Sequence, residues 1–409
     1  MPSGASTREE TRVIEAYADA KPTIAAEVSP ETPLESLNLN WRERDLPEKQ
    51  RTKHVHRLHP YLGKFIPQLV EVFLRKYFQP GQTVADPFAG SGTTLVQANE
   101  LGIHSIGYDI SAFNVLLMRA KTERCDPAKL ESEVRDAINA VRRTNCTAAR
   151  IPELDDEMTD DEPVDSDYLR HWYAPEALRE LLTFRSAIMR ANPRYELILK
   201  VILCRAARSA RLTTHFDLDF PKQPTTEPYY CYKHSRTCEP TRDAMKFLER
   251  YAADTVARVA EFQALRTDAD VTIIHADSAK ARVAKIDGII TSPPYVGLID
   301  YHEQHAYAYH LLGLKDRRSE EIGAAANGQS ERAKRKYQEA IANVFDRFVK
   351  KMPSGGPIIV VAGDKHNLYP RIAELIGVET EAVLHRHVNR RTGRRNNAFF
   401  ESVFIWRKR

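Results

Sequence analysis

The chain of 409 residues is 42% hydrophobic and 28% charged, and its formal net charge is +4. These values predict a folded, soluble protein with a substantial core, long enough for one domain with insertions or for two domains. The net charge is too small to indicate nucleic-acid binding by itself, so evidence for that function must come from local clusters of cations.

The cysteines and the apolar segments indicate the compartment. The five cysteines are odd in number and show no disulfide framework, which predicts a reducing, cytoplasmic environment. No apolar run approaches the roughly 20 residues of a membrane-spanning helix. Residues 1–12 also lack the apolar core of a signal peptide. We therefore expect a cytoplasmic protein with no membrane partner.

The first third of the chain predicts a nucleotide-binding unit. Residues 1–40 are polar and show little periodicity, which predicts a weakly ordered leader. The apolar spacing of residues 67–78 predicts a helix. A strand at 84–86, a glycine-containing loop, a helix at 93–101 and a strand at 105–109 follow. This succession, within about 30 residues, is typical of a parallel nucleotide-binding sheet.

The middle of the chain interrupts this pattern. Residues 120–268 carry mostly helical periodicity, so we expect a helical insert in a sheet domain formed by residues 41–119 and 269–409. Alternating strands and helices resume after the insert. The strands are predicted at 271–275, 286–290 and 356–362, a helix at 371–377, and a closing pair of strands at 383–388 and 402–406.

The loop Asp86-Pro87-Phe88-Ala89-Gly90-Ser91-Gly92-Thr93-Thr94 separates the first strand from its helix. Its two glycines allow tight turns and close approach of a ligand, and the helix N-terminus favours a carboxylate or a phosphate. Asp109 ends the next strand, where it can bind ribose hydroxyls. The loop lacks the lysine of a P-loop and the third glycine of a dinucleotide loop. It therefore favours a nucleoside without phosphates, such as S-adenosylmethionine.

The tetrapeptide Ser292-Pro293-Pro294-Tyr295 follows another predicted strand. Its two prolines fix the backbone and remove two amide donors, so that carbonyl groups are left outward at the strand end. A small polar side chain and a carbonyl can accept both hydrogens of an exocyclic amine, and Tyr295 can stack on an extruded base. No cysteine follows a proline, which argues against methylation at carbon 5 of cytosine.

The loop and the tetrapeptide resemble the motifs of the amino-methylating DNA methyltransferases, and the form Thr-Ser-Pro-Pro-Tyr most resembles their cytosine-N4 branch. The resemblance covers about residues 41–120 and 270–409. It implies a Rossmann-like, mostly parallel seven-stranded sheet with an antiparallel C-terminal hairpin. It also implies site-specific transfer of a methyl group from S-adenosylmethionine to the N4 amine of cytosine in double-stranded DNA, with base flipping, as part of restriction–modification.

The resemblance also assigns residues to two sites. The expected catalytic residues are Ser292, Pro293, Pro294 and Tyr295. The expected cofactor-binding residues are Lys64, Phe65, Pro67, Asp86, Pro87, Phe88, Ala89, Gly90, Gly92, Thr93, Thr94, Asp109, Ile110 and Asp277.

Cations mixed with aromatic residues indicate where DNA would bind, and the helical insert is the expected target-recognition region. Arg205, Arg208 and Arg211 share one face of a predicted helix. Lys233 and Arg236 alternate with tyrosines, a mixture suited to phosphate and base contacts. A further cluster is expected to clamp a phosphate near the catalytic face. It consists of Arg390, Arg391, Arg394 and Arg395, between the last two strands.

Cys231, His234 and Cys238 form a Cys-x2-His-x3-Cys pattern. Zinc prefers four ligands, and the nearest further candidates, His215 and Glu239, do not complete a convincing set. The sequence therefore predicts no metal site.

Three other functions stay open. The first is methylation of adenine N6. The identity of Ser292 favours cytosine over adenine, because adenine enzymes more often carry Asp or Asn at that position. An RNA or protein-amine methyltransferase would share the logic of the tetrapeptide. A non-catalytic DNA-binding subunit would keep the fold, although the intact motifs argue against it. A cognate restriction endonuclease, acting separately, would be a partner of a restriction–modification enzyme.

Overall fold

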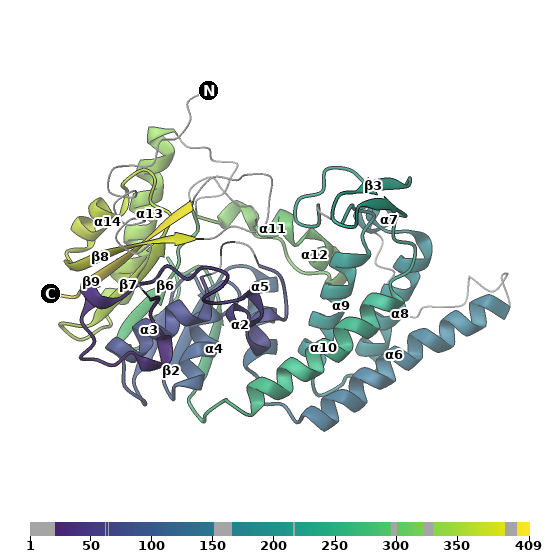
Figure 1. Ribbon diagram of the computed structural model, residues 1–409, viewed down its shortest axis with the longest axis horizontal. Coiled ribbons are helices and arrows are strands. Elements are labelled where there is room, and N and C mark those ends of the chain that lie inside the picture. The colour runs from purple at the N-terminus through teal and green to yellow at the C-terminus, as the bar shows by residue number, and fades with distance from the viewer. Residues whose placement is uncertain are drawn as a thin grey trace.

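The protein consists of a sheet lobe and a lobe of helices that lie side by side (Figure 1). The computed structural model describes residues 21–61, 63, 65–150, 166–215, 217–295, 301–322, 330–388 and 399–409. Residues 1–20 of the predicted leader and the predicted site residues Lys64, Arg390, Arg391, Arg394 and Arg395 lie outside these ranges.

The central sheet has seven strands in the order β5-β2-β1-β6-β7-β9-β8. The first five strands in this order run parallel, and β9 lies antiparallel between β7 and β8. The predicted fold, a mostly parallel α/β sheet with an antiparallel C-terminal pair, is confirmed. The strands are β1 Thr83–Asp86, β2 His104–Asp109, β5 Val271–His275, β6 Gly288–Thr291, β7 Pro357–Ala362, β8 Glu379–Val388 and β9 Phe399–Arg407.

Helices cover both faces of this sheet, which explains why its strands are apolar at successive positions. In β7 every residue is buried. Ile359 and Val361 pack on the face of α3 and α4, whereas Ile358 and Val360 pack on the face of α13 and α14. The helices α3 Pro67–Tyr77, α4 Thr93–Glu100 and α5 Ala112–Thr122 follow the predicted pattern, and α14 is Tyr369–Ile376. The sequence analysis did not identify α13, Glu331–Val349.

The helical lobe lies within the segment that the sequence marked as an insert. Its helix α9 is apolar almost all round and forms the centre of the lobe. The same apolar cluster includes Phe113 and Leu117 of α5 and Tyr307 of α12 (Ala306–Leu312), so the lobe shares its core with the sheet layer. The elements are α6 Pro127–Arg150, α7 Asp167–Trp172, α8 Pro175–Ala191, α9 Glu196–Ala210, β3 Tyr229–Cys231, β4 Arg236–Cys238 and α10 Met245–Gln263.

Short helices connect these layers. They are η1 Ala25–Glu27, η2 Leu34–Ser36, α2 Glu48–Arg51, η3 His54–Arg57, α11 Tyr301–Gln304, α12 Ala306–Leu312 and η4 Arg318–Glu320. None of the described helices combines the length and the apolar composition needed to cross a membrane.

The prediction of a weakly ordered leader is wrong for residues 21–40. Leu37 and Leu39 are buried in the cluster that contains α3. The backbone is held by hydrogen bonds from Thr23 N to the Asn38 carbonyl, at 2.9 Å, and from Asn38 N to Thr23 Oγ1, at 2.8 Å. The segment covers α3 as an irregular strap, so its apolar residues follow no regular period. A prediction from periodicity alone therefore does not detect their contacts.

Candidate active site

Asp86 joins the two loops that carry the predicted motifs. It ends β1, and Thr291 ends the neighbouring parallel strand β6. The buried Asp86 carboxylate accepts hydrogen bonds from Thr94 Oγ1 at 2.7 Å, Thr291 Oγ1 at 2.6 Å and Phe88 N at 3.1 Å. The Asp86 carboxylate therefore holds the beginning of both loops at the same edge of the sheet. Burial raises the pKa of Asp86 to about 6, and these hydrogen bonds lower it in part.

The loop after β1 depends on two glycines. Gly90 and Gly92 have φ angles of +50° and +79°, which L side chains rarely adopt. A Cβ on Gly92 would lie 2.9 Å from Met118 Cγ, and one on Gly90 would lie 3.1 Å from Tyr61 Oη. The turn can therefore sit close to both α5 and the segment that contains Tyr61. The turn lies at the N-terminus of α4, and Gly90 lines the cavity described below.

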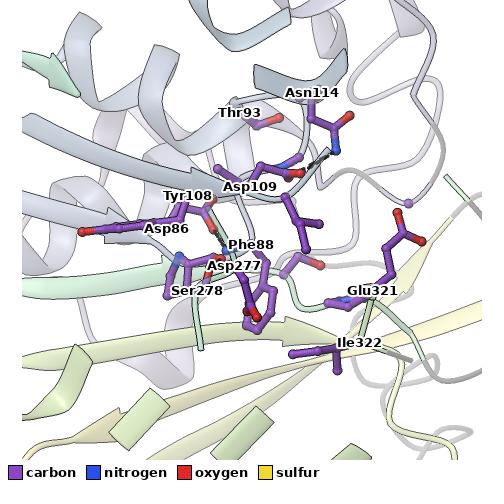
Figure 2. A pocket seen from close by; sticks show the side chains of 18 of the residues that line it. Asp86, Phe88, Thr93, Tyr108, Asp109, Asn114, Asp277, Ser278, Glu321 and Ile322 are labelled. Atoms are coloured by element: carbon purple, nitrogen blue, oxygen red, sulfur yellow. Dashed lines mark hydrogen bonds between the residues drawn. The ribbon is translucent and has the colours of Figure 1, made fainter. Parts of the chain in front are cut away.

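Asp109 ends β2 beside this turn. One carboxylate oxygen accepts from Gly90 N at 2.8 Å and the other from Ser111 N at 2.8 Å. Asn114 Nδ2 donates to the same carboxylate at 3.1 and 3.2 Å and to Tyr61 Oη at 3.1 Å (Figure 2). Burial raises the pKa of Asp109 to about 7, although each of these hydrogen bonds favours the ionised form.

A cavity of about 920 Å³, including its mouth, opens at the carboxyl ends of β1, β2 and β6 (Figure 2). Its position follows the general rule that open parallel sheets bind ligands at this edge. The predicted site residues that line it are Phe65, Asp86, Pro87, Phe88, Ala89, Gly90, Thr93, Asp109, Ile110, Asp277, Ser292 and Pro294. Residues from both motifs therefore face one space.

Five of the predicted site residues that the structure describes do not line this cavity, but most of them hold the segments that form its wall. Pro67 begins α3, Gly92 caps α4, and Thr94 donates to Asp86. Pro293 is the buried member of the tetrapeptide. Tyr295 Oη donates to Glu401 Oε1 of β9 at 2.9 Å.

The tetrapeptide is held from two sides. The carbonyl of Pro294 accepts a hydrogen bond from Tyr337 Oη of α13 at 2.9 Å. Glu401, which binds Tyr295, lies in turn 3.5 Å from Arg386 Nε of β8. Both members of that ion pair are buried. The loop that presents Ser292 is thus fixed by a helix on one side and by the C-terminal strand pair on the other.

Ten further residues line the cavity that were not assigned to a site from the sequence, although Ser91 lies within the predicted cofactor loop. They are Tyr61, Gly63, Ser91, Tyr108, Asn114, Ala276, Ser278, Glu320, Glu321 and Ile322. Most lie within a few positions of a predicted residue, so the motifs could have pointed to them. The segment 320–322 had no such signal. Glu321 accepts from the buried His302 Nδ1 at 2.6 Å, while His302 Nε2 accepts from Arg317 N at 3.2 Å.

Comparison with known proteins agrees with this geometry. A family model for N6/N4 methyltransferases, described as DNA methylase, matches residues 11–118. The chain is 38% identical over 432 aligned positions to the type II methyltransferase M.MjaII of Methanocaldococcus jannaschii, which covers 88% of this chain and 81% of that protein. The chain belongs to the amino-methylating DNA methyltransferase family.

Two further proteins are similar to this methyltransferase. The type II methyltransferase M.MvaI of Kocuria varians is 31% identical over 110 residues, which is 24% of each chain. The rRNA methyltransferase aviRa from Streptomyces viridochromogenes is a solved structure with a TM-score of 0.32 and 13% identity. That match covers 86% of this chain and 89% of the other.

The structure of this methyltransferase corrects the predicted DNA-binding face of α9. Arg205 is buried and pairs with Asp254 at 2.5 Å, while Arg208 pairs with Asp219 at 2.6 Å. The buried Arg211 donates to the carbonyl of Leu218. A three-residue spacing does not distinguish an exposed helix face from one packed inside a lobe, and here the guanidinium groups hold neighbouring segments. Lys233 and Arg236, in contrast, are exposed.

The bond from Thr291 to Asp86 gives a stability prediction. The substitution Thr291→Val should lower the free energy of unfolding by about 1–3 kcal/mol, because the buried carboxylate loses a donor. Unfolding in urea, followed by fluorescence, measures this loss. The matched control is Thr122→Val, since the buried Thr122 hydroxyl donates only to the Met118 carbonyl within its own helix. Equal losses in the two variants would contradict a special role for the Asp86 anchor.

Proposed function

We propose that this methyltransferase transfers the methyl group of S-adenosylmethionine to the exocyclic N4 amine of cytosine in double-stranded DNA, after the target base has been flipped out. The observation that carries the proposal is the shared cavity. Asp109 and the turn at Gly90 lie on its wall together with Ser292 and Pro294. The proposed methyl donor and the proposed acceptor can therefore meet without movement of the sheet.

The residues of the cavity fit S-adenosylmethionine. The Asp109 carboxylate at the end of β2 suits the two ribose hydroxyls. Phe88, Ile110 and Ile322 supply apolar walls for a flat ring. Asp277, held in its turn by a hydrogen bond from Ala279 N at 2.9 Å, would accept from the adenine amine. The amides at the start of α4 suit the carboxylate of the methionine part.

The proposed chemistry requires orientation more than acid or base strength. When bound, S-adenosylmethionine would supply a methyl group on a sulfonium: as the amine nitrogen bonds to the methyl carbon, the carbon–sulfur bond would break, the neutral thioether S-adenosylhomocysteine would leave, and the amine would lose one proton. Ser292 Oγ and a proline carbonyl of the tetrapeptide would accept the amine hydrogens and so aim the nitrogen lone pair. The Pro294 carbonyl already accepts from Tyr337, and this bond keeps the loop in place. Tyr295 would stack on the extruded base.

The chain would act in restriction–modification, with a cognate endonuclease as a separate chain. This part of the proposal is supported by the similarity to M.MjaII, a type II methyltransferase. Adenine N6 is the alternative acceptor, and Ser292 in place of Asp or Asn favours cytosine.

Product analysis tests the reaction. The protein is incubated with labelled S-adenosylmethionine and unmodified duplex DNA of mixed sequence, and the DNA is digested to nucleosides. We expect label in N4-methylcytosine and its loss in Ser292→Ala. Label in N6-methyladenine would replace the proposed acceptor. Absence of label together with intact cofactor binding would support a non-catalytic DNA-binding subunit instead.

Asp109 gives a pH prediction. Ribose hydroxyls donate to the ionised carboxylate, so S-adenosylmethionine should bind more tightly as the pH rises through about 7. Below that pH the affinity should fall by up to about tenfold per pH unit, because the proton must be displaced. Calorimetry from pH 6 to pH 8 measures this dependence. Asp109→Asn should abolish it, and Asp109→Ala should weaken binding at pH 8 by about tenfold or more. Unchanged affinity in Asp109→Ala would refute the assignment.

Two substitutions of Tyr295 distinguish stacking of its ring on the base from the hydrogen bond of its hydroxyl to Glu401. We expect Tyr295→Ala to reduce turnover by about tenfold or more with little change in cofactor affinity, because stacking on a base contributes about 1–3 kcal/mol. Tyr295→Phe keeps the ring and loses the hydroxyl that donates to Glu401, so most of its turnover should remain. Turnover and cofactor affinity are measured separately for both variants. Wild-type turnover in Tyr295→Ala would remove this residue from the active site.

A further inference from the structure

Four metal-ligand side chains meet in the helical lobe, apart from the cavity. Cys231 ends β3, Cys238 ends β4, and His234 lies in the turn between these strands. His215 comes from the loop that follows α9. The four ligand atoms all lie within 4.8 Å of one another, and none of these residues lines the cavity. His215 was unconvincing as a fourth ligand from the sequence alone, whereas the structure places its ring beside the other three residues.

The distances between the ligand atoms fit one tetrahedral ion. Zinc–sulfur and zinc–nitrogen bonds of about 2.3 and 2.0 Å at tetrahedral angles place a sulfur and a nitrogen about 3.5 Å apart. His215 Nδ1 lies 3.6 Å and His234 Nδ1 3.7 Å from Cys231 Sγ. His234 Nδ1 lies 3.4 Å from Cys238 Sγ. The two imidazole rings are 4.6 Å apart and meet edge to face, at 66°.

The donor set selects among metals. Two thiols and two imidazoles suit zinc, whereas magnesium and calcium prefer oxygen ligands. Both thiols are buried, and neither forms a disulfide. Tyr229 Oη lies 2.8 Å from His215 Nδ1 and also accepts from His215 N at 3.1 Å. With an ion bound, the lone pair of His215 Nδ1 would coordinate the metal. Tyr229 Oη would still accept the hydrogen bond from His215 N.

We propose that His215, Cys231, His234 and Cys238 bind one zinc ion. Four protein ligands close the coordination shell, so the ion would be structural. Binding would release the protons of the two thiols, which leaves a thiolate pair to balance the charge of the ion.

The ion would hold a short ribbon that is weak without it. A two-stranded hairpin is marginally stable by itself in water. The ribbon β3–β4 lies on top of the helical lobe in Figure 1. Its exposed side chains include Tyr230, 54% exposed, Tyr232, 80% exposed, Lys233 and Arg236. If the chain acts on DNA as proposed above, zinc would fix this group of cations and aromatic rings as a contact surface.

Metal analysis tests the site without any methylation assay. The full chain is purified without chelator and analysed by elemental and native mass spectrometry. We expect about one zinc ion per chain. The double variant Cys231→Ser, Cys238→Ser should bind none, while Cys146→Ser, at an exposed free cysteine, should keep it. Cobalt in place of zinc should give the visible absorption of a tetrahedral thiolate site.

A second variant guards against misfolding. His234 is exposed, so His234→Ala should retain the helical circular dichroism while it loses zinc more readily to a chelator. Its affinity for S-adenosylmethionine should equal that of the wild type, since the cavity is separate. Wild-type protein that stays free of zinc after supply of the ion, or a disulfide between Cys231 and Cys238 in protein prepared under reducing conditions, would overturn the site. Neither result bears on the proposed methyl transfer.

Discussion

The hydrogen bonds to the Asp86 carboxylate are the constraint on which the rest of the site depends. Removal of a carboxylate from water is costly unless its oxygens find donors. Thr94 and Thr291 supply two hydroxyls, from the helix after β1 and from the end of β6. Because one carboxylate holds both segments, Thr94 through Oδ2 and Thr291 through Oδ1, the loop proposed to bind the cofactor and the loop proposed to bind the base are fixed relative to each other. The raised pKa of Asp86 shows that burial is only partly compensated.

The fold and much of the cavity could be predicted because parallel strands end at a common edge. Motifs placed directly after strands must then meet, even when the chain between them is long. Eleven of the twelve predicted residues that line the cavity lie at a strand end or in the loop or helix start that follows it, whereas Phe65 precedes α3. The segment at Glu320–Ile322 escaped prediction because it reaches the cavity through the contact between His302 and Glu321, which leaves no periodic trace in the sequence.

The other wrong predictions share one physical cause: the spacing of residues along the sequence does not show whether their side chains are buried. Arg205 and Arg211 are three positions either side of Arg208, as on an exposed helix face, yet they are buried within the lobe. His215 was unconvincing as a ligand from the sequence and lies 16 positions before Cys231, yet its Nδ1 lies 3.6 Å from Cys231 Sγ. The strap at residues 21–40 was read as loose because its apolar residues follow no period, although they cover α3.

The position of the helical lobe within the chain also sets the order in which the molecule can assemble. Asp86 and Thr291 are 205 positions apart, so their bond closes a very long loop and carries a large entropic cost if the intervening chain is unfolded. Most members of the apolar cluster of the helical lobe lie between these two positions in the chain. Their early collapse would shorten that loop, so the β1–β6 pairing and the reaction centre beside it would be among the last features to form.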